Sequence, residues 1–403
     1  MSPNDRDHSD IETDNGFSYV PADANLAIPV RRRATAMWGT APDATILAPG
    51  RIEIVGNHVD YNGGNVISAA IDRWVAVAAQ LRTDGALTVS APDVGRGVAT
   101  ESIDAIRTSS DGPEAATPGW YALPRAAVAA ALEAGMNIAG AALYYRGTIP
   151  LGLGLASSSA LFVALVGALD RITDSNVGRF RIAQIAQAGE HRLGIPVGLL
   201  DQVTSIVGGL LRFSNRRDQI RRLTPPQGDT VFVVIDSGVQ HTLRTSRYAL
   251  RVAECRQALT MLQEAGNQIN ALAELPLSDL EAAEALLPPP LDQRLRHVVQ
   301  EVERVHQAEA AIAASDLIEL GRIMNESGDS SATLYDISHP KVEALIVAAR
   351  KVPGVYGARM MGGGDGGAAL VLVERAALPA LEQAITTSPL TVCRIARGAT
   401  VVN

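Results

Sequence analysis

Short apolar segments separated by glycine turns fill residues 43–100, and this pattern is typical of β-strands. A further strand is expected over 141–149, and the continuous apolar run 161–169 behind it indicates a buried helix. The rest of the chain mixes both periods, with strands expected at 231–236 and 391–395 and helices within 180–192, 246–265 and 291–325. This mixture predicts an α/β (α+β) fold.

Length and composition indicate how many domains to expect. A chain of 403 residues is long for one hydrophobic core, so two domains are expected. Hydrophobic residues make up 47% of the chain and charged residues 19%, which is the composition of a globular protein. No internal repeat is visible, and region 270–290 is expected to be a surface excursion rather than a domain boundary.

Negative charge is concentrated near the N-terminus. Residues 1–30 hold six acids against Arg6, a net charge of −5, and they show no apolar periodicity. The remaining chain carries only about −3 of the total of −8, so no nucleic-acid partner is expected. Residues 1–34 are predicted to form a disordered acidic tail. The triplet Arg31–Arg33 is interpreted as a solvated helix start rather than a targeting signal, because no hydrophobic segment follows it.

Two further observations bear on the compartment. No segment reaches the ~20 apolar residues that span a bilayer, so no membrane partner is expected. Cys255 and Cys393 are the only cysteines and lie far apart, which fits a reducing environment. Together these observations predict a cytoplasmic protein.

Lysine is nearly absent, and this limits how a nucleotide could be held. Only Lys341 and Lys351 occur, and no glycine–lysine–serine/threonine phosphate loop exists. Phosphates would therefore be bound by backbone N–H groups, arginines and a metal ion. This excludes kinases of the P-loop class.

A suitable phosphate loop lies between the strand at 141–149 and the helix behind it. Glycines at 152 and 154 would let the backbone approach a phosphate, and Ser157–Ser159 stand at the helix start, where free N–H groups attract anions. The alternative is an ordinary glycine turn with a serine N-cap.

Polar side chains gather at the end of the strand within the run Ala48–Gly64, A-P-G-R-I-E-I-V-G-N-H-V-D-Y-N-G-G. Arg51 precedes alternating apolar residues, and Asn57, His58 and Asp60 follow them. Hydrogen-bonding groups bunched where a buried strand ends are suited to a small polyhydroxylated ligand.

These segments resemble the galactokinases, in the GHMP family of small-molecule kinases. The run Ala48–Gly64 is similar to their signature G-R-V-N-L-I-G-E-H-T-D-Y-N-G-G, and Pro150–Ala160 to P-x-G-x-G-L-x-S-S-A. Gly189–Gln202 resembles E-H-x-x-x-G-x-x-x-G-I-M-D-Q, and Arg359–Val373 contains a counterpart of G-G-G-F-G-G-C. The resemblance covers about residues 35–403. It implies the two-lobed GHMP kinase fold with domains 35–212 and 213–403 and the active site in the cleft between lobes.

The resemblance also implies roles for individual residues. Asp201 would be the catalytic carboxylate that orients or deprotonates the accepting hydroxyl, and Arg51 would keep it ionised and stabilise the transferred phosphoryl. The alternatives are a helix N-cap for Asp201 and a structural ion pair between domains for the two residues together. Ser158 and Glu190 would hold Mg²⁺. The expected ligand contacts are, for the sugar, Asn57, His58, Asp60, Gly198 and Tyr248, and, for ATP, Gly152, Gly154, Leu155, Ser157, Ser158, Ser159 and Trp120.

The chain departs from the galactokinase pattern at several positions. Asn57 replaces a glutamate, Arg247 replaces a glutamate beside Tyr248, and Asp365 replaces a phenylalanine in the third glycine motif. Asp365 is expected to point away from the phosphates or to pair with an arginine such as Arg359. Smaller departures are alanines at 156 and 368 and a Glu190–Asp201 interval that is one residue shorter.

The expected function is an ATP- and Mg²⁺-dependent sugar kinase that phosphorylates galactose or a close relative at the anomeric hydroxyl. Asn57 leaves a different acceptor open, namely a uronic acid, an N-acetyl sugar or a cyclitol, because it removes a negative charge from position 57. A galactokinase-like sugar sensor without turnover is the non-enzymatic alternative. The presence of Arg51, Ser157, Ser158 and Asp201 favours the enzyme.

Overall fold

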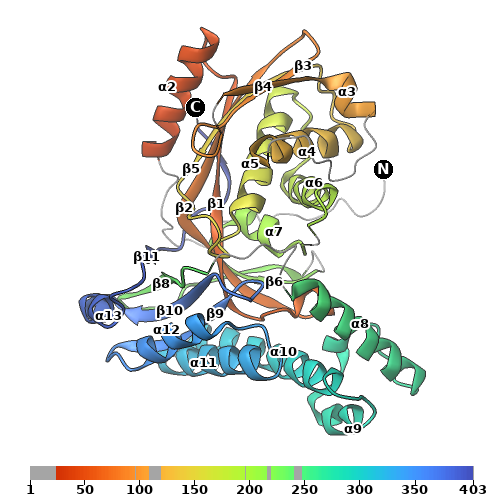
Figure 1. Cartoon of the computed structure of the whole chain (residues 1–403), viewed down its shortest axis with the longest axis vertical. Helices are drawn as coiled ribbons and strands as arrows, with labels where there is room; N and C mark the ends of the chain where they lie inside the picture. The colour runs from red at the N-terminus through yellow and green to blue at the C-terminus, as the bar shows by residue number, and fades with distance from the viewer. Residues whose placement is uncertain are drawn as a thin grey trace.

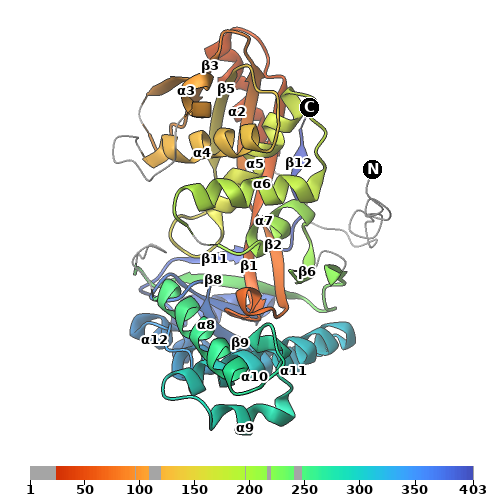
Figure 2. The ribbon, with the colours of Figure 1, turned by 90° about the vertical axis from the view of Figure 1, so that its right-hand side faces the viewer.

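The computed structural model describes residues 24–95, 97–108, 119–195, 197–215, 219–239 and 247–402. Two long antiparallel strands, β1 (Ala44–Val55) and β2 (Val66–Leu81), form the centre of the fold. Both extend between the upper and lower parts of the molecule, in opposite directions (Figures 1 and 2). Every residue of β1 is buried, so its side chains pack on both faces of the sheet.

The large lobe is built on an eight-stranded sheet with the path β12-β1-β2-β5-β3-β4, to which β6 adds through β2 and β7 through β6. Its remaining strands are β3 (Ala86–Ser90), β4 (Val98–Ser102), β5 (Ala141–Gly147), β6 (Leu210–Phe213), β7 (Arg221–Leu223) and β12 (Thr400–Val401). β3 and β5 pair in parallel, and the other pairs are antiparallel.

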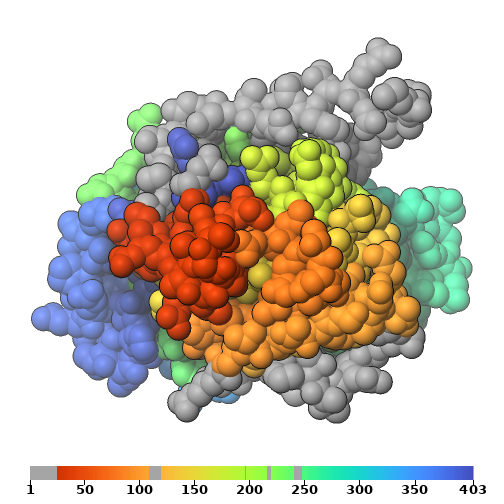
Figure 3. All heavy atoms as spheres, turned by 90° about the horizontal axis from the view of Figure 1, so that it is seen from above, coloured from red at the N-terminus to blue at the C-terminus, as the bar shows by residue number. Residues whose placement is uncertain are grey.

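Helices cover both faces of this sheet. One face carries α4 (Gly119–Glu133), α5 (Ser157–Ile172), α6 (Arg179–Arg192) and α7 (Leu200–Val207), next to the short α3 (Ile103–Thr108). The other face carries α2 (Ala24–Trp38), which is red in Figures 1 and 3. Side chains alternate accordingly along β1, with Ile46 in the main core and Leu47 in the cluster under α2.

Helix α2 corrects part of the expected tail. The chain is helical from Ala24, and Leu26, Ala27, Val30 and Ala34 are buried against the sheet. The helix start expected at Arg31–Arg33 is therefore wrong, because these residues lie within α2, and its first turns were missed since apolar positions are few and Pro29 interrupts the pattern. The expected acidic tail over residues 1–23 lies outside the described residues.

The small lobe contains a four-stranded antiparallel sheet in the order β11-β8-β10-β9. Its strands are β8 (Thr230–Asp236), β9 (Val355–Met361), β10 (Ala368–Glu374) and β11 (Leu390–Cys393). Its helices are α8 (Tyr248–Glu264), α9 (Leu280–Glu284), α10 (Leu291–Ala314), α11 (Leu317–Thr333), α12 (Pro340–Arg350) and α13 (Leu378–Ala384). The expected helical stretch 291–325 is two helices, because Ser315 is left-handed and Asp316 caps the start of α11.

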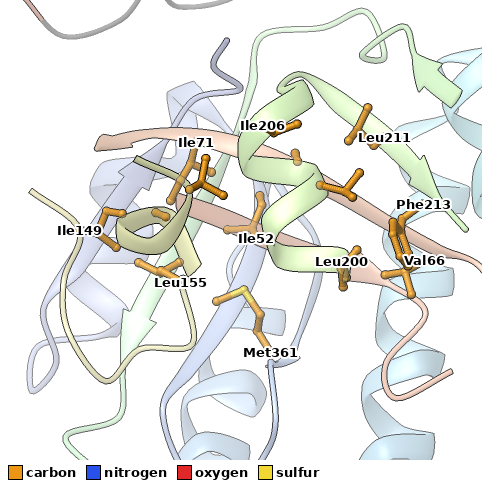
Figure 4. Close-up of a cluster of buried hydrophobic side chains, with 14 of the residues drawn as sticks. Ile52, Val66, Ile71, Ile149, Leu155, Leu200, Ile206, Leu211, Phe213 and Met361 are labelled. Carbon is orange, nitrogen blue, oxygen red and sulfur yellow. The ribbon is translucent and has the colours of Figure 1, made fainter. Parts of the chain in front are cut away.

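The chain crosses between the lobes more than once. Strands β7 and β12 belong to the large sheet although both follow residue 212, the expected domain boundary. Apolar side chains from both lobes meet beneath the junction, where Ile52 and Leu200 lie near Met361 of β9 (Figure 4). None of the described helices is long and apolar enough to cross a membrane.

Candidate active site

A cleft at the junction of the lobes brings together most of the candidate residues from the sequence. Its lining comes from β1 and the turn behind it, the glycine–serine loop, the start of α7, the start of α8 and the loop between β9 and β10. The candidates that line it are Arg51, Asn57, His58, Asp60, Gly152, Gly154, Leu155, Ser157, Ser158, Ser159, Gly198, Asp201 and Tyr248. Glu190 and Trp120 are placed elsewhere.

Arg51 and Asp201 form a close ion pair in the middle of the cleft. Arg51 Nε and Nη2 each lie 2.8 Å from Asp201 Oδ1, and Nη1 donates to the carbonyl of Gly154. Oδ2 of Asp201 accepts no hydrogen bond from the described residues. Both side chains stand on elements of the large lobe. The pair therefore does not bridge the two lobes, whereas the alternative of a structural ion pair between domains required it to do so.

The glycine–serine loop leads directly into the N-terminus of α5. Gly152 and Gly154 have positive φ values of 78° and 71°, and Ala156 is left-handed at the N-cap position. The first turn of α5, with Ser157 and Ser158, therefore presents its free N–H groups to the cleft. Backbone donors at a helix start suit an anionic phosphate.

Glu190 lies behind this loop rather than on the cleft wall. It is fully buried and accepts hydrogen bonds from Ser158 Oγ at 2.7 Å, from Ser159 Oγ at 2.9 Å and from Gln202. Burial raises the pKa of Glu190 to about 7. Apart from the amide nitrogen of Gln202, the polar atoms in this cluster are carboxylate and hydroxyl oxygens. Oxygen ligands suit Mg²⁺ better than a soft metal. No group of three or more His, Cys, Asp or Glu suited to a metal occurs in the described part of the chain.

His58 and Asp60 occupy the turn behind β1. His58 is buried with a left-handed φ of 62°, and its Nδ1 lies 2.8 Å from the hydroxyl of Tyr61. Burial lowers the pKa of His58 to about 3, so the ring is neutral near pH 7. Burial, aided by the neighbouring carboxyl of Glu53, raises the pKa of Asp60 to about 7. A strained backbone at a cleft is typical of functional positions.

Gly198 lets the backbone before α7 approach Asp60 closely. A Cβ at this position would lie 2.2 Å from Asp60 Oδ2, so no larger residue fits without displacing the carboxyl. Next to Asp60 in the cleft wall, the ring centroid of Tyr248 lies 5.1 Å from that of His58. The glycine, the carboxyl and the two rings thus enclose one end of the cleft.

Asn57 is buried and fully hydrogen-bonded. Its Nδ2 donates to Glu53 Oε1 at 2.7 Å and to the carbonyl of Gly362 at 3.0 Å, and its Oδ1 accepts from Ser331 Oγ at 3.1 Å. Glu53 also lines the cleft. Sequence reasoning missed it, although its position two residues after Arg51 on the same strand places both on one face.

Asp365 pairs with Arg247 and not with Arg359. Arg247 Nε lies 2.6 Å from Asp365 Oδ1, and the Arg247 backbone N–H donates to Oδ2, so Asp365 anchors the start of α8 beside Tyr248. Arg359 is fully buried, and its Nη1 lies 3.6 Å from Glu53 Oε1. The two unusual residues at 247 and 365 therefore compensate each other's charge.

A second, more apolar cavity adjoins the cleft at Ser157 and Ser158. Trp120, Leu123 and Tyr145 line it, and Tyr145 Oη donates to the Trp120 carbonyl at 2.7 Å. Aromatic and aliphatic walls next to a phosphate loop would suit a nucleobase. The glycine–serine loop therefore lies between the Trp120 cavity and the part of the cleft that holds Arg51 and Asp201.

A glycine–serine loop at a helix start, a guanidinium–carboxylate pair and two α/β lobes are the features expected of a small-molecule kinase of the GHMP class. Family models agree: GHMP kinases N terminal domain matches residues 122–209, and GHMP kinases C terminal matches residues 308–388. A third model, the galactokinase galactose-binding signature, matches residues 35–81.

Within this class the chain belongs to the galactokinase family. It is 34% identical over 381 residues to a galactokinase of Roseiflexus sp. (strain RS-1), covering 92% of this chain and 95% of the relative. It is 32% identical to the galactokinase of Homo sapiens, covering 89% and 91%. The crystal structure of Lactococcus lactis galactokinase complexed with galactose superposes with a TM-score of 0.85 at 27% identity, covering 93% of this chain and 99% of that one. A mevalonate kinase of Methanococcus jannaschii shares the fold, with a TM-score of 0.66 at 17% identity and 87% and 98% coverage.

Proposed function

We propose that the protein transfers the γ-phosphoryl group of ATP to the anomeric hydroxyl of galactose. The observation that carries this proposal is Asp201 in the wall of the cleft, with an Oδ2 that accepts no hydrogen bond from the described residues. Membership in the galactokinase family and the similarity to a galactokinase structure complexed with galactose support galactose as the acceptor.

The residues divide the reaction among themselves. Asp201 Oδ2 accepts the proton of the sugar hydroxyl while the oxygen of that hydroxyl attacks the γ-phosphorus of ATP. The bond from this phosphorus to the β–γ bridging oxygen breaks, and ADP is released. Arg51 fixes Asp201 through Oδ1 and reaches the phosphate loop through the Gly154 carbonyl. The N–H groups at the start of α5 bind phosphate oxygens, and Trp120 contacts the base.

Ser158 and Glu190 are the residues that would hold Mg²⁺. Their oxygens already lie 2.7 Å apart, and a carboxylate with a hydroxyl matches the few protein ligands that this ion takes. When bound, the ion would neutralise charge on the ATP phosphates. Glu190→Gln should raise the Mg²⁺ concentration for half-maximal rate while galactose KM stays unchanged.

Coupled ADP release with a panel of acceptors tests the function. Galactose should be preferred over galacturonate, N-acetylgalactosamine and inositol, and Asp201→Asn should lower kcat by about 10²- to 10⁴-fold. Asp229→Asn, an exposed aspartate paired with Arg375, is the matched control and should keep full activity. Preference for another acceptor by a hundredfold would reject galactose. A sugar sensor would bind ATP and galactose, seen as a raised melting temperature, without ADP release.

A further inference from the structure

Glu53 places a carboxyl group in the cleft that the proposed reaction does not use. It stands on β1 two residues after Arg51, and only 5% of its surface is exposed. It shares the cleft wall with Asp60 and Asp201. Burying a carboxyl without function is costly, so its contacts indicate what it does.

The two oxygens of Glu53 differ in their surroundings. Oε1 accepts from Asn57 Nδ2 at 2.7 Å and lies 3.6 Å from Arg359 Nη1. Oε2 accepts no hydrogen bond from the described residues and is not among their buried atoms that lack a partner, so we infer that it reaches the cleft that Glu53 lines. Burial raises the pKa of Glu53, and the charge of Arg359 opposes this rise and favours the ionised form.

Asn57, in contrast, has no donor left for a ligand. Both hydrogens of Nδ2 are used, by Glu53 and by the Gly362 carbonyl, and the side chain is fully buried. The signature quoted above has asparagine at the place of Glu53 and glutamate at the place of Asn57. This chain keeps the amide–carboxylate pair and exchanges its members, so the charge has moved from the turn after β1 onto β1 itself rather than been lost.

We propose that Glu53 binds the acceptor sugar, with Oε2 accepting a hydrogen bond from a sugar hydroxyl, and that Asn57 is a positioning residue that holds Oε1. This inference rests on the proposed function, because it needs a neutral hexose in the cleft. Among the described residues that line the cleft, Arg51 alone is cationic, and Asp201 and Gly154 already occupy it. The carboxyls of Glu53, Asp60 and Asp201 therefore select hydroxyl donors and disfavour an anionic sugar.

The test combines enzyme variants with sugar variants. kcat and KM are measured for galactose and its 2-, 3-, 4- and 6-deoxy derivatives with wild type, Glu53→Gln and Glu319→Gln, an exposed control carboxylate paired with Arg322. Glu53→Gln should lower kcat/KM for galactose about 10- to 100-fold, mainly through KM, since it removes a charge-assisted hydrogen bond. One deoxy sugar should cost wild type a similar factor and cost Glu53→Gln nothing further.

Asn57→Ala should also raise galactose KM, with ATP KM and kcat retained, because Glu53 loses its support. The double variant Glu53→Asn with Asn57→Glu tests the exchange and should recover galactose binding relative to Glu53→Gln. Equal losses for every deoxy sugar in wild type and Glu53→Gln would overturn the role of Glu53, as would an unchanged galactose KM in Glu53→Gln. No phosphorylation of galactose by wild type would overturn the proposed function, and this inference with it.

Discussion

Arg51 holds Asp201 by one oxygen only. Nε and Nη2 of the guanidinium both lie 2.8 Å from Oδ1, and Nη1 reaches the carbonyl of Gly154 in the phosphate loop. A single planar side chain thereby fixes the carboxylate through Oδ1, leaves Oδ2 without a hydrogen-bond donor among the described residues and ties the carboxylate to the loop that precedes α5.

Arg51→Lys should separate charge from geometry. An ammonium keeps the positive charge but cannot contact Asp201 and Gly154 with a planar fork, so kcat should fall about 10- to 100-fold with stability little changed. Steady-state ADP release and thermal melting check this. Arg322→Lys on the exposed face of α11 is the control. A kcat within twofold of wild type would show that charge alone suffices.

Gly198→Ala should damage sugar binding selectively. The added Cβ would meet Asp60 Oδ2 at 2.2 Å, so the carboxyl must move and galactose KM should rise about tenfold or more. ATP KM should not change, because the phosphate loop is untouched. Gly167→Ala in α5, where a Cβ makes only ordinary contact with Ile46 at 3.6 Å, should leave both KM values as they are. Equal rises in both KM values would point to general distortion instead.

Trp120→Ala should weaken the binding of ATP and leave the binding of the sugar unchanged. Loss of the aromatic wall should raise ATP KM about 5- to 30-fold, on the scale of one aromatic contact of ~1–2 kcal/mol. Galactose KM at saturating ATP should be retained. Trp38→Ala, a truncation in the cluster under α2, is the comparison that changes stability without touching the cavity. The assignment of Trp120 fails if galactose KM shifts as much as ATP KM.

Stability without ligands should depend on pH through Asp60. Its folded pKa is raised to about 7 from an ordinary 3.8, so the carboxyl is protonated in both states below about pH 4. As pH rises toward 7, the unfolded chain ionises freely while the folded protein does not, and the free energy of unfolding falls. Asp60→Asn lacks this penalty. Its stability relative to wild type should therefore increase between pH 4 and 7.5 by up to about 4 kcal/mol.

Urea unfolding at pH 4.5 and 7.5 measures this difference. Asp229→Asn, which replaces an exposed aspartate, should show no comparable change between the two pH values. A difference between Asp60→Asn and wild type that does not vary with pH would mean that Asp60 ionises normally in the folded protein.

Local patterns predicted much of the fold. The strand at 141–149, the apolar helix at 161–169 and the strand at 231–236 are present as β5, α5 and β8 with small shifts at their ends. These elements are buried apolar runs bounded by glycine, proline or serine in the sequence, so a local pattern is enough to locate them. The extent of α2 was not predicted, also because its stability comes from packing against β1, β2 and β5, which a local pattern does not contain.

The candidate site was predictable where a motif carries a backbone shape. Gly152, Gly154 and Gly198 could be singled out because few residues fit such positions. Long-range pairs could not be predicted. Asp365 meets Arg247 from another element, and whether Asn57 faces a ligand or Glu53 depends on how β1 turns. Such choices are made by tertiary packing and not by spacing along the chain.

Strand β12 has a consequence for how the enzyme matures. Thr400 pairs with Leu47 of β1, the strand that carries Arg51, and Ala399 N–H donates to the carbonyl of Ser205 in the helix that carries Asp201. Gly398 fits so closely under α7 that a side chain there would collide with the Ile206 carbonyl. Residues 396–402 thus close the large lobe long after its other strands have been synthesised. A chain whose synthesis has not reached this segment already contains Arg51 and Asp201 but lacks the contacts that support β1 and α7, so activity should be acquired only after residues 396–402 have been added.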